Sequence, residues 1–437
     1  MKFGGASIIK PQRLHQVAKL ITSEEGRKIV VLCASSGITN ALAEISEALS
    51  LGDKNLANLH IESLKEDFYP QYVAELLTDE QKIEKANEIF SEHFKFLNSI
   101  LNVSFSESLS KDIIAEGELL NTKLFSVYLQ QQHIEHVVLS ALDFMFLDRY
   151  EEAQVGTIKV RLAQLLNRNK DIDILITQGN IARNAKGEVD NLRNGGADFS
   201  ASLIAAAVNA DVCEIWTDID GMRNNDPRIV KETLPIEHLS FDEAADLAYF
   251  GAKILHPASI WPTQFFNIPL RLLNILKPDA QGTLITENAR SNGVKAVAAK
   301  DGITAITIKT SRMLSVYTFL MRTIENLEKY NISFDMITIS KEIIFVSIDY
   351  DIDFTEIVKD FEEYAYIKIE TNQTIVSIVG NEIIETKDIM RKTFESLSSI
   401  PLRRISYGGS RNNISILIDR SYKEQTLKLL NKVLFNL

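Results

Sequence analysis

Two lysines beside glycine-containing breaks are the residues of this chain best suited to phosphate chemistry. Lys2 is followed by Gly4 and Gly5, at a point where a short strand should lead into a helix. Glycines let the backbone approach a ligand closely, and the free N–H groups at a helix start attract anions. Lys253 lies in a second break, within FGAKILHP. A mobile ammonium beside such N–H groups favours phosphate binding, although the pattern K-x-G-G alone fits a plain turn equally well.

Further polar segments follow other apolar, strand-like runs or stand at the start of a helical pattern. They read ASSGITN, ITQGNIA, NGGADFSA and IWTDIDG. In parallel α/β sheets, ligands bind in the crevice outside the carboxyl ends of the strands. These segments therefore predict such a crevice. Helix capping is the alternative role, for Ser36 or Thr39 in the first segment and for Asp198 at the helix start in the third.

The elements that must position these groups alternate between strands and helices. Apolar runs occur at 28–35, 136–141, 171–179, 213–218 and 268–276, with helical patterns between them. Strands that are apolar throughout, alternating with helices, imply a mainly parallel sheet covered on both faces. Region 54–101 is helical and charged, which predicts an inserted helical hairpin. We expect a catalytic α/β domain over residues 1–290.

After about residue 285 the pattern changes to shorter, alternating strands with an internal repeat. The segments NISFDMITISKEIIFVSID (331–349) and IPLRRISYGGSRNNISILID (400–419) each follow a helical pattern and end in Ile-Asp. Repetition of this kind indicates two copies of a small βαβ-type unit. We place the copies at residues 300–370 and 371–437.

Composition excludes several classes of function. The net charge of −12 argues against a nucleic-acid surface. Cys33 and Cys213 each lie in an apolar run without metal-ligand spacing, which is typical of buried thiols in a reducing compartment. The start lacks the regions of a signal peptide, and no apolar run approaches the roughly 18 residues of a membrane span. We expect a soluble, cytoplasmic protein with no membrane partner.

Taken in order, the motifs resemble those of aspartate kinases. They are KFGGAS, ASSGITN, GELLNTKL, ITQGNIA, GGADFSA, IWTDIDG, NNDPR, FGAKILHPA and GTLI. Over nearly its whole length the chain resembles a monofunctional aspartokinase of the amino acid kinase superfamily. The resemblance implies an α/β amino acid kinase fold, a mainly parallel central sheet sandwiched by helices, followed by two βαββαβ ACT regulatory modules. It also implies a homodimer formed through those modules.

The reaction implied by the resemblance is transfer of the ATP γ-phosphoryl group to the β-carboxylate of L-aspartate. The product is 4-phospho-L-aspartate, at the start of lysine, threonine and methionine biosynthesis, and ATP and Mg²⁺ are the implied cofactors. The nucleophile is already an anion, with a reference pKa of about 3.9, so the reaction needs no general base. Catalysis should then rest on charge neutralisation and alignment.

The resemblance also assigns roles to individual residues. The expected catalytic residues are Lys2, Asp198 and Lys253. The expected aspartate-binding residues are Thr39, Glu118, Arg193, Asn194, Gly195, Gly196 and Ala197. The expected ATP-binding residues are Lys2, Phe3, Gly4, Gly5, Thr217, Asp218, Arg223, Arg228, Lys253 and Ile254. An effector amino acid, with lysine as the first choice, is expected at Met313, Phe319, Leu320 and Asp335. No residue is assigned to a protein-held metal.

Two departures from the family pattern keep other functions open. Asn194 stands where relatives carry an arginine that grips a substrate carboxylate, and Ala197 replaces a serine. Only Met1 precedes Lys2, which predicts a shortened first strand that holds Lys2 less firmly. A start codon assigned too late, or trimming of the chain, would explain the short strand. One alternative is a degenerate kinase fold serving as an amino-acid sensor or partner-binding protein. The other is a kinase for a different carboxylate, such as glutamate.

Overall fold

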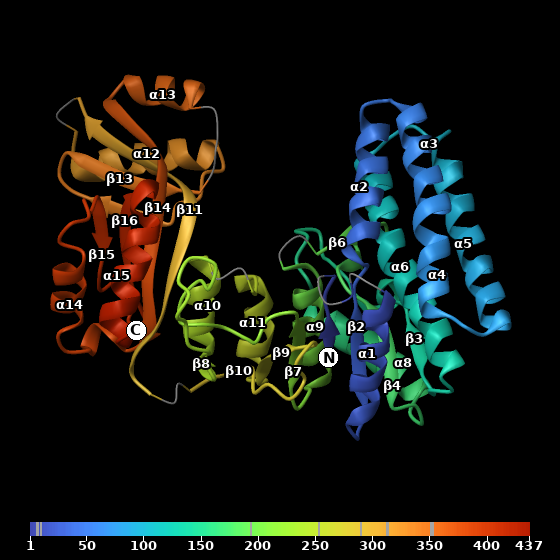
Figure 1. Ribbon diagram of the computed structural model, residues 1–437. Coiled ribbons are helices and arrows are strands. Elements are labelled where there is room, and N and C mark those ends of the chain that lie inside the picture. Colours follow the sequence, from blue (N-terminus) through green and yellow to red (C-terminus); the bar gives the residue numbers. More distant parts are fainter. Residues whose placement is uncertain are drawn as a thin grey trace. The chain divides into compact units, whose positions relative to one another are not determined.

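The computed structural model describes residues 1–5, 8, 11–192, 195–251, 254–288, 291–311, 314–349 and 354–437. The described residues form two compact units (Figure 1). The first unit comprises residues 1–222, 237–241 and 254–288, and the second comprises 223–236, 242–253 and 289–437. The chain therefore passes between the units several times before residue 290.

The first unit is built on a mainly parallel sheet with the strand order β3-β4-β2-β1-β7-β9-β10-β8. The strands are β1 (Lys2–Phe3), β2 (Lys28–Leu32), β3 (Val137–Leu139), β4 (Ile174–Gln178), β7 (Cys213–Thr217), β8 (His238–Ser240), β9 (Leu270–Asn274) and β10 (Thr283–Thr286). Only the β9–β10 pair is antiparallel among the strand pairs of this described sheet. Strand β4 is buried along its whole length, as expected for a strand covered on both faces.

Helices connect these strands and cover the sheet. They are α1 (Pro11–Ser23), α2 (Ser36–Ser50), α3 (Lys54–Ser63), α4 (Tyr69–Leu76), α5 (Glu80–Ile100), α6 (Glu107–Gln131), α7 (Ala141–Phe144), α8 (Val155–Arg168), α9 (Gly196–Val208) and α11 (Pro257–Phe265). A π-helical turn, Leu64–Phe68, joins α3 to α4, and a small hairpin is formed by β5 (Ile181–Arg183) and β6 (Val189–Asn191). The polar segments after β2 and before α9 thus lie at strand-to-helix junctions, as the sequence predicts.

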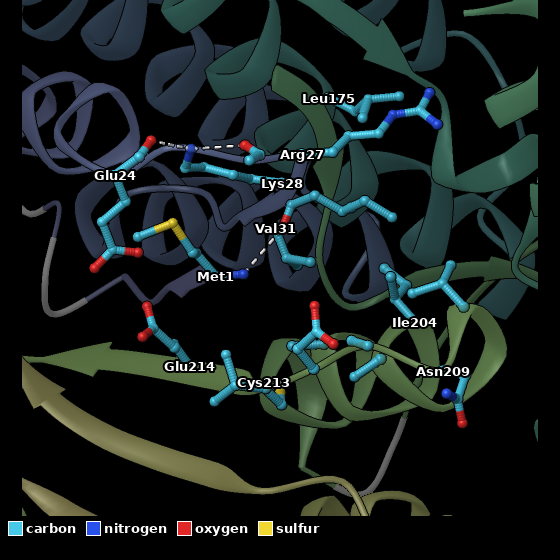
Figure 2. Close-up of a pocket in the computed structure, with 18 of the residues that line it drawn as sticks. Met1, Glu24, Arg27, Lys28, Val31, Leu175, Ile204, Asn209, Cys213 and Glu214 are labelled. Atoms are coloured by element: carbon cyan, nitrogen blue, oxygen red, sulfur yellow. Dashed lines mark hydrogen bonds between the residues drawn. The ribbon is translucent and has the colours of Figure 1, made fainter. Parts of the chain in front are cut away.

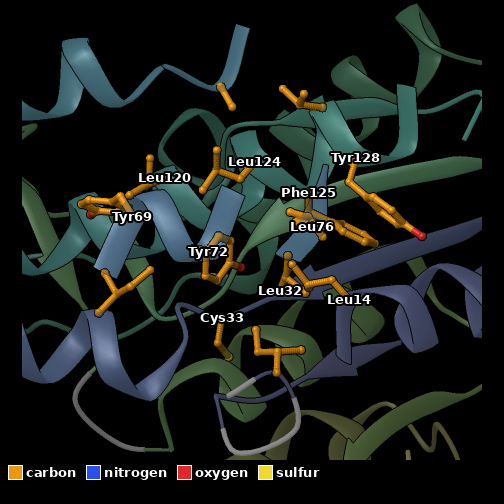
Figure 3. Packing of buried hydrophobic residues seen from close by; sticks show 14 of the residues in the cluster. Leu14, Leu32, Cys33, Tyr69, Tyr72, Leu76, Leu120, Leu124, Phe125 and Tyr128 are labelled. Atoms are coloured by element: carbon orange, nitrogen blue, oxygen red, sulfur yellow. The ribbon is translucent and has the colours of Figure 1, made fainter. Parts of the chain in front are cut away.

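A shared apolar core joins the region around residues 54–101 to the sheet. Helix α6 presents Leu120, Leu124, Phe125 and Tyr128 on one face, at the spacing of a helical period. Figure 3 shows these side chains with Tyr69, Tyr72 and Leu76 of α4, Leu14 of α1 and Leu32 of β2. Helix α6 packs between the helical insertion and the sheet through its buried residues, which run from Ile113 to Leu129. It is therefore a stable support for Glu118, which lies on the same helix.

The second unit contains a sheet with the strand order β12-β13-β11-β14-β16-β15. The strands are β11 (Gly293–Thr310), β12 (Met336–Ile339), β13 (Ile343–Ile348), β14 (Ala365–Asn381), β15 (Arg404–Ser406) and β16 (Asn413–Asp419). The helices are α10 (Phe241–Tyr249, with Phe241 assigned to the first unit), α12 (Val316–Lys329), α13 (Thr355–Glu362), α14 (Ile389–Ser396) and α15 (Lys423–Phe435). The strand pairs of this described sheet are antiparallel.

The two repeats share the long strands β11 and β14. Residues 303–310 of β11 pair with 365–373 of β14 in the first repeat, and residues 293–300 pair with 375–381 in the second. A register shift between Lys300 and Ile303 separates the two halves of β11. The first repeat is therefore a continuous βαββαβ unit, whereas the fourth and last strand of the second repeat comes from residues 293–300, upstream of the first repeat.

No helix in the described ranges is long and apolar enough to cross a membrane.

Candidate functional site

The predicted phosphate loop follows a short central strand. Strand β1 pairs with β2 on one side and β7 on the other, placing Lys2 opposite Val31 and Ile215. All three strands are parallel, so their carboxyl ends open at the same edge of the sheet, where ligands of such sheets bind. Gly4 follows β1 at this edge. Phe3 anchors the strand beneath it, since its buried ring stacks on Trp216 with 5.9 Å between centroids.

Lys2 and Asp198 form a buried ion pair at this edge. The Lys2 Nζ lies 2.5 Å from Asp198 Oδ1, and Lys2 is only 9% exposed. Burial lowers the pKa of Lys2, but Asp198 and other nearby acidic groups outweigh it, so the pKa is raised and the ammonium stays charged. A Cβ on Gly4 would stand 2.6 Å from the Lys2 Nζ, so glycine leaves the space that the ammonium occupies. The structure thus brings together two of the three expected catalytic residues.

Glu118 lies at the same edge, buried on α6. Gly117 lets this helix approach β2, because a Cβ there would stand 3.2 Å from the Ala34 Cβ. The Ala34 backbone N–H donates to Glu118 Oε2 at 2.7 Å. Burial raises the pKa of Glu118 to about 8, while the Ala34 N–H and the charge of Lys2 limit the rise. A buried carboxyl that already accepts one hydrogen bond is suited to bind a cationic group.

Glycines at the start of α9 allow Asp198 to reach Lys2. Gly195 and Gly196 have φ values of +81° and +51°, in the left-handed region that favours glycine. Ala197 packs against Gly179 at the end of β4, where a Cβ on Gly179 would stand 2.4 Å from the Ala197 Cβ. The close approach of α9 to β4 depends on that missing methyl group.

Replacing Gly179 with alanine should therefore destabilise the first unit by about 1–3 kcal/mol, because the added methyl group overpacks a backbone contact. The expected result is a lower midpoint in thermal unfolding. Gly156→Ala on α8 is a matched control, since a Cβ there would meet nothing within 4 Å. The control should be neutral or stabilising by up to about 1 kcal/mol. Equal midpoints for the two variants would contradict the packing argument.

A buried polar network around Glu118 was not predicted from the sequence. Thr122 Oγ1 donates to the Glu118 carbonyl at 3.0 Å and accepts from Gln178 Nε2 at 2.8 Å. The Tyr72 hydroxyl donates to Asn121 Oδ1 at 2.7 Å. Asn121 Nδ2 also donates to the carbonyl of Cys33 just after β2, so these side chains hold α6 against the ends of β2 and β4. The polar residues Asn121 and Thr122, three and four residues after Glu118 on an otherwise apolar helix, could have indicated this network.

Two other buried hydroxyls near this edge were also not predicted from the sequence. Ser35 follows β2 and Thr177 lies in β4, and both side chains are fully buried. Within the described residues, neither hydroxyl oxygen has a hydrogen-bond partner. Buried polar groups are usually paired, so these two are available for hydrogen bonds to a bound molecule.

The remaining predicted residues of the first unit have the following positions. Thr39 lies on α2, and its hydroxyl donates to the Ser35 carbonyl at 3.3 Å. Thr217 ends β7 and donates to Asp218 Oδ1 at 3.3 Å. Ile254 is half-buried, before α11. In the described ranges no group of three or more His, Cys, Asp and Glu side chains could hold a metal ion.

Other predicted residues belong to the second unit. Arg223 donates from Nε to Thr233 Oγ1 at 2.6 Å, and Arg228 pairs with Asp226 through Nη2 and Oδ2 at 2.7 Å. Of the expected effector residues, Phe319 is buried in the core of the first repeat, Leu320 packs beside it, and Asp335 is paired with Lys300. Arg193, Asn194, Lys253 and Met313 lie outside the described residues.

A cavity of about 500 Å³ lies at the opposite, amino edge of the same sheet (Figure 2). It is lined by Met1, by Lys28 and Val31 of β2, and by Cys213 and Glu214 of β7. Strand β1 spans two residues and its neighbours five, so the cavity occupies the space beside β2 and β7 that β1 does not fill. The Lys2–Asp198 pair lies at the other edge of the sheet. We therefore assign the cavity no part in phosphate chemistry.

Comparison with known proteins identifies the family of the chain. A model of the amino acid kinase family matches residues 1–274, and an ACT domain model matches residues 376–434. Aspartokinase 3, chloroplastic, from Arabidopsis thaliana is 30% identical over 466 positions, covering 100% of this chain and 81% of the relative. The chain belongs to the aspartokinases of the amino acid kinase family. This confirms the expected family, the α/β kinase fold and the ACT region.

Two further aspartokinase comparisons cover almost the whole chain. The lysine-sensitive aspartokinase 3 of Escherichia coli K12 is 29% identical, over 99% of this chain and 98% of the relative. The crystal structure of E. coli aspartokinase III in complex with aspartate and ADP matches with a TM-score of 0.86 at 27% identity, covering 99% of each chain. The complex of that enzyme with lysine and aspartate matches with a TM-score of 0.76.

Proposed function

We propose that this chain transfers the γ-phosphoryl group of ATP to the β-carboxylate of L-aspartate, giving 4-phospho-L-aspartate. The observation that carries the proposal is the buried Lys2–Asp198 pair at the edge of the sheet that also holds Glu118. Both substrates are anionic at the reacting atoms, so a fixed cation in a buried site is the group the reaction needs most. The aspartokinase relatives support the same substrate pair, since one was crystallised with aspartate and ADP.

The reaction needs alignment and charge neutralisation rather than a base. A β-carboxylate oxygen of aspartate attacks the γ-phosphorus, and the bond from that phosphorus to the β,γ-bridging oxygen breaks. ADP leaves with the electron pair, and no proton has to move. Lys2 is positioned to neutralise charge on the transferring phosphoryl group, and Asp198 orients its ammonium. Mg²⁺ enters as the Mg·ATP substrate, in which the cation is held mainly by the substrate phosphates and water.

Glu118 is the proposed partner of the substrate α-ammonium. It is buried, and its Oε2 is already fixed by the Ala34 N–H. Thr39, on the helix that follows β2, is proposed to contact the same substrate. The hydroxyls of Ser35 and Thr177 add unpaired polar atoms among the described residues at this edge. We propose that these groups partly compensate for the asparagine at position 194.

The test is ATP- and Mg²⁺-dependent phosphorylation of L-aspartate, with the acyl phosphate trapped by hydroxylamine. Aspartate-specific turnover that disappears in Lys253→Ala establishes the kinase. Turnover with L-glutamate instead would establish a kinase for another carboxylate. No turnover from folded protein that still binds ATP or an amino acid would overturn the proposal in favour of a sensor.

Regulation and assembly follow the family in this proposal. We propose that the ACT region binds an effector amino acid, with lysine first because the E. coli relative is lysine-sensitive. We also propose a cytoplasmic homodimer formed through the ACT modules. Calorimetry should show heat on adding lysine, and sedimentation equilibrium should give twice the chain mass of 49.2 kDa. Absence of heat with lysine, threonine and methionine would contradict the effector proposal.

A further inference from the structure

A buried hydroxyl, that of Ser202, links the helices α9 and α11 of the first unit. Ser202 lies one helical turn after Asp198 on α9 and is fully buried. Its Oγ stands 3.1 Å from the Asp198 carbonyl oxygen and 2.5 Å from the Ser259 carbonyl oxygen on α11. A serine hydroxyl has one proton to donate, so the shorter contact, to Ser259, is the main hydrogen bond. The hydroxyl therefore joins the turn that carries Asp198 to the first turn of α11.

The first turn of α11 contacts α9 at a second place, the N-cap residue Gly195. This glycine has a φ of +81°, and a Cβ there would stand 2.2 Å from Ser259 Oγ. Ser259 is only 1% exposed, and among the described residues its Oγ has no hydrogen-bond partner. Its hydroxyl thus fills the space that the glycine leaves open. Ser259 therefore contacts α9 both before and after Asp198, at Gly195 through its side chain and at Ser202 through its carbonyl.

The same turn of α9 is also held by the chain just after β4. Ala197 packs against Gly179, and Ser200 Oγ accepts a hydrogen bond from the Asn180 N–H at 2.8 Å. The N-cap glycine provides no side-chain hydrogen bond to the helix start. Because a helix start without a side-chain cap is weakly held by its own residues, contacts with neighbouring elements must fix it. Asp198 therefore takes its position from contacts with both β4 and α11.

We propose that Ser202 is a positioning residue for phosphoryl transfer. Its hydroxyl ties the first turn of α9 to α11 and so holds the Asp198 carboxylate at the Lys2 ammonium, where the two lie 2.5 Å apart. The members of this ion pair come from separate elements, β1 and α9, and small displacements of groups at a reacting centre are costly to the rate. The inference rests on the proposed function, in which Lys2 neutralises the transferring phosphoryl group and Asp198 orients the ammonium.

A double-mutant cycle in the full-length chain tests whether Ser202 acts through Asp198. Ser202→Ala should lower kcat about tenfold, with the KM values for ATP and aspartate within about twofold of native, because Lys2 is present but less well oriented. In the Asp198→Asn background the same change should lower kcat by less than about twofold, since the charged partner of Lys2 is already absent. Equal losses of kcat in the two backgrounds, or a native kcat in folded Ser202→Ala, would overturn the proposal.

Thr263→Val on α11 is the matched control for Ser202→Ala. Thr263 is fully buried, and its hydroxyl donates to the Ile260 carbonyl at 2.8 Å within its own helix. The control thus removes a buried hydroxyl from the same pair of helices without removing the hydrogen bond between them, so kcat should remain native. A loss of kcat in Thr263→Val as large as in Ser202→Ala would indicate a general packing defect and would count against the proposal.

Hydrogen exchange tests the link between the helices without using kinase activity. Amides 198–201 should exchange faster in Ser202→Ala than in the native chain, because the first turn of α9 opens more readily, whereas Thr263→Val should leave their exchange unchanged. Equal exchange at 198–201 in the native chain and Ser202→Ala would contradict the positioning role. If the native chain is inactive, faster exchange in Ser202→Ala still supports the link, and only the proposed function fails.

Discussion

Replacing Lys2 with methionine will lower kcat for aspartate phosphorylation by about 1,000-fold. Removing one preorganised donor from a developing negative charge typically costs 10²–10³ in kcat, and Lys2 supplies a full charge in a buried site. Methionine keeps an unbranched apolar stem close to that of lysine and lacks only the ammonium end, so the packing of β1 should survive. The measurement is single-turnover phosphoryl transfer at saturating Mg·ATP and aspartate.

Lys28→Met is the matched control for Lys2→Met. Lys28 starts β2 in the same sheet, at its amino edge, and its ammonium donates to the Gly26 carbonyl at 2.9 Å. Its loss should leave kcat unchanged. Asp198→Asn should lower kcat less than Lys2→Met, because the lysine remains but loses the partner that orients it. A kcat in folded Lys2→Met within a factor of about ten of the native value would show that the phosphoryl group is stabilised elsewhere.

Aspartate will bind more tightly as the pH rises from 6 to 8, and binding at pH 7 will release a proton. Burial raises the pKa of Glu118 to about 8, so in the empty site this carboxyl is mostly neutral at pH 7. The α-ammonium of aspartate favours the carboxylate, and the displaced proton goes to solvent. Below pH 8 the affinity should therefore improve by up to about tenfold per pH unit, and above pH 8 it should level off.

Calorimetry measures both consequences of the Glu118 pKa. The observed heat at pH 7 should vary with the ionisation enthalpy of the buffer, in proportion to the protons released. Glu118→Gln should weaken aspartate binding by about 100-fold at pH 8.5, since it removes one partner of a buried ion pair. The same variant should lose the dependence of affinity on pH. A pH profile in Glu118→Gln that matches the native profile would place the titrating group elsewhere.

Much of the candidate site could be predicted because its residues follow strands. Lys2 and Asp198 are far apart in sequence, yet each lies at a glycine-rich junction between a strand and a helix. Parallel strands bring the end of β1 to the ligand edge, but α9 follows β6 of the separate β5–β6 hairpin, so the meeting of these two residues also depends on the packing of α9 against the end of β4. The identity of the family came from the order of the motifs. The hydrogen bond from Ala34 to Glu118 could not be predicted, because it depends on the depth at which α6 packs.

The contacts of the second unit were less predictable. Tyr249 and Asp335 meet across 86 residues of sequence, and no periodicity marks either one as a partner of Lys300. The repeat itself could be predicted from the sequence, because each of its two copies contains a strand that ends in Ile-Asp. The sharing of β11 and β14 was not, since pairing between distant strand halves is set by tertiary packing and a bulge rather than by local pattern.

The shared strands also determine the order in which the ACT region can fold during translation. Residues 303–373 hold every strand of the first repeat, so this repeat can close as soon as they have left the ribosome. Residues 293–300 are made earlier but pair with residues 375–381. At synthesis rates of about 5–20 residues per second, this strand waits roughly 4–15 seconds for its partner. During that interval it is an unpaired sheet edge, the kind of surface on which nascent chains associate and chaperones act.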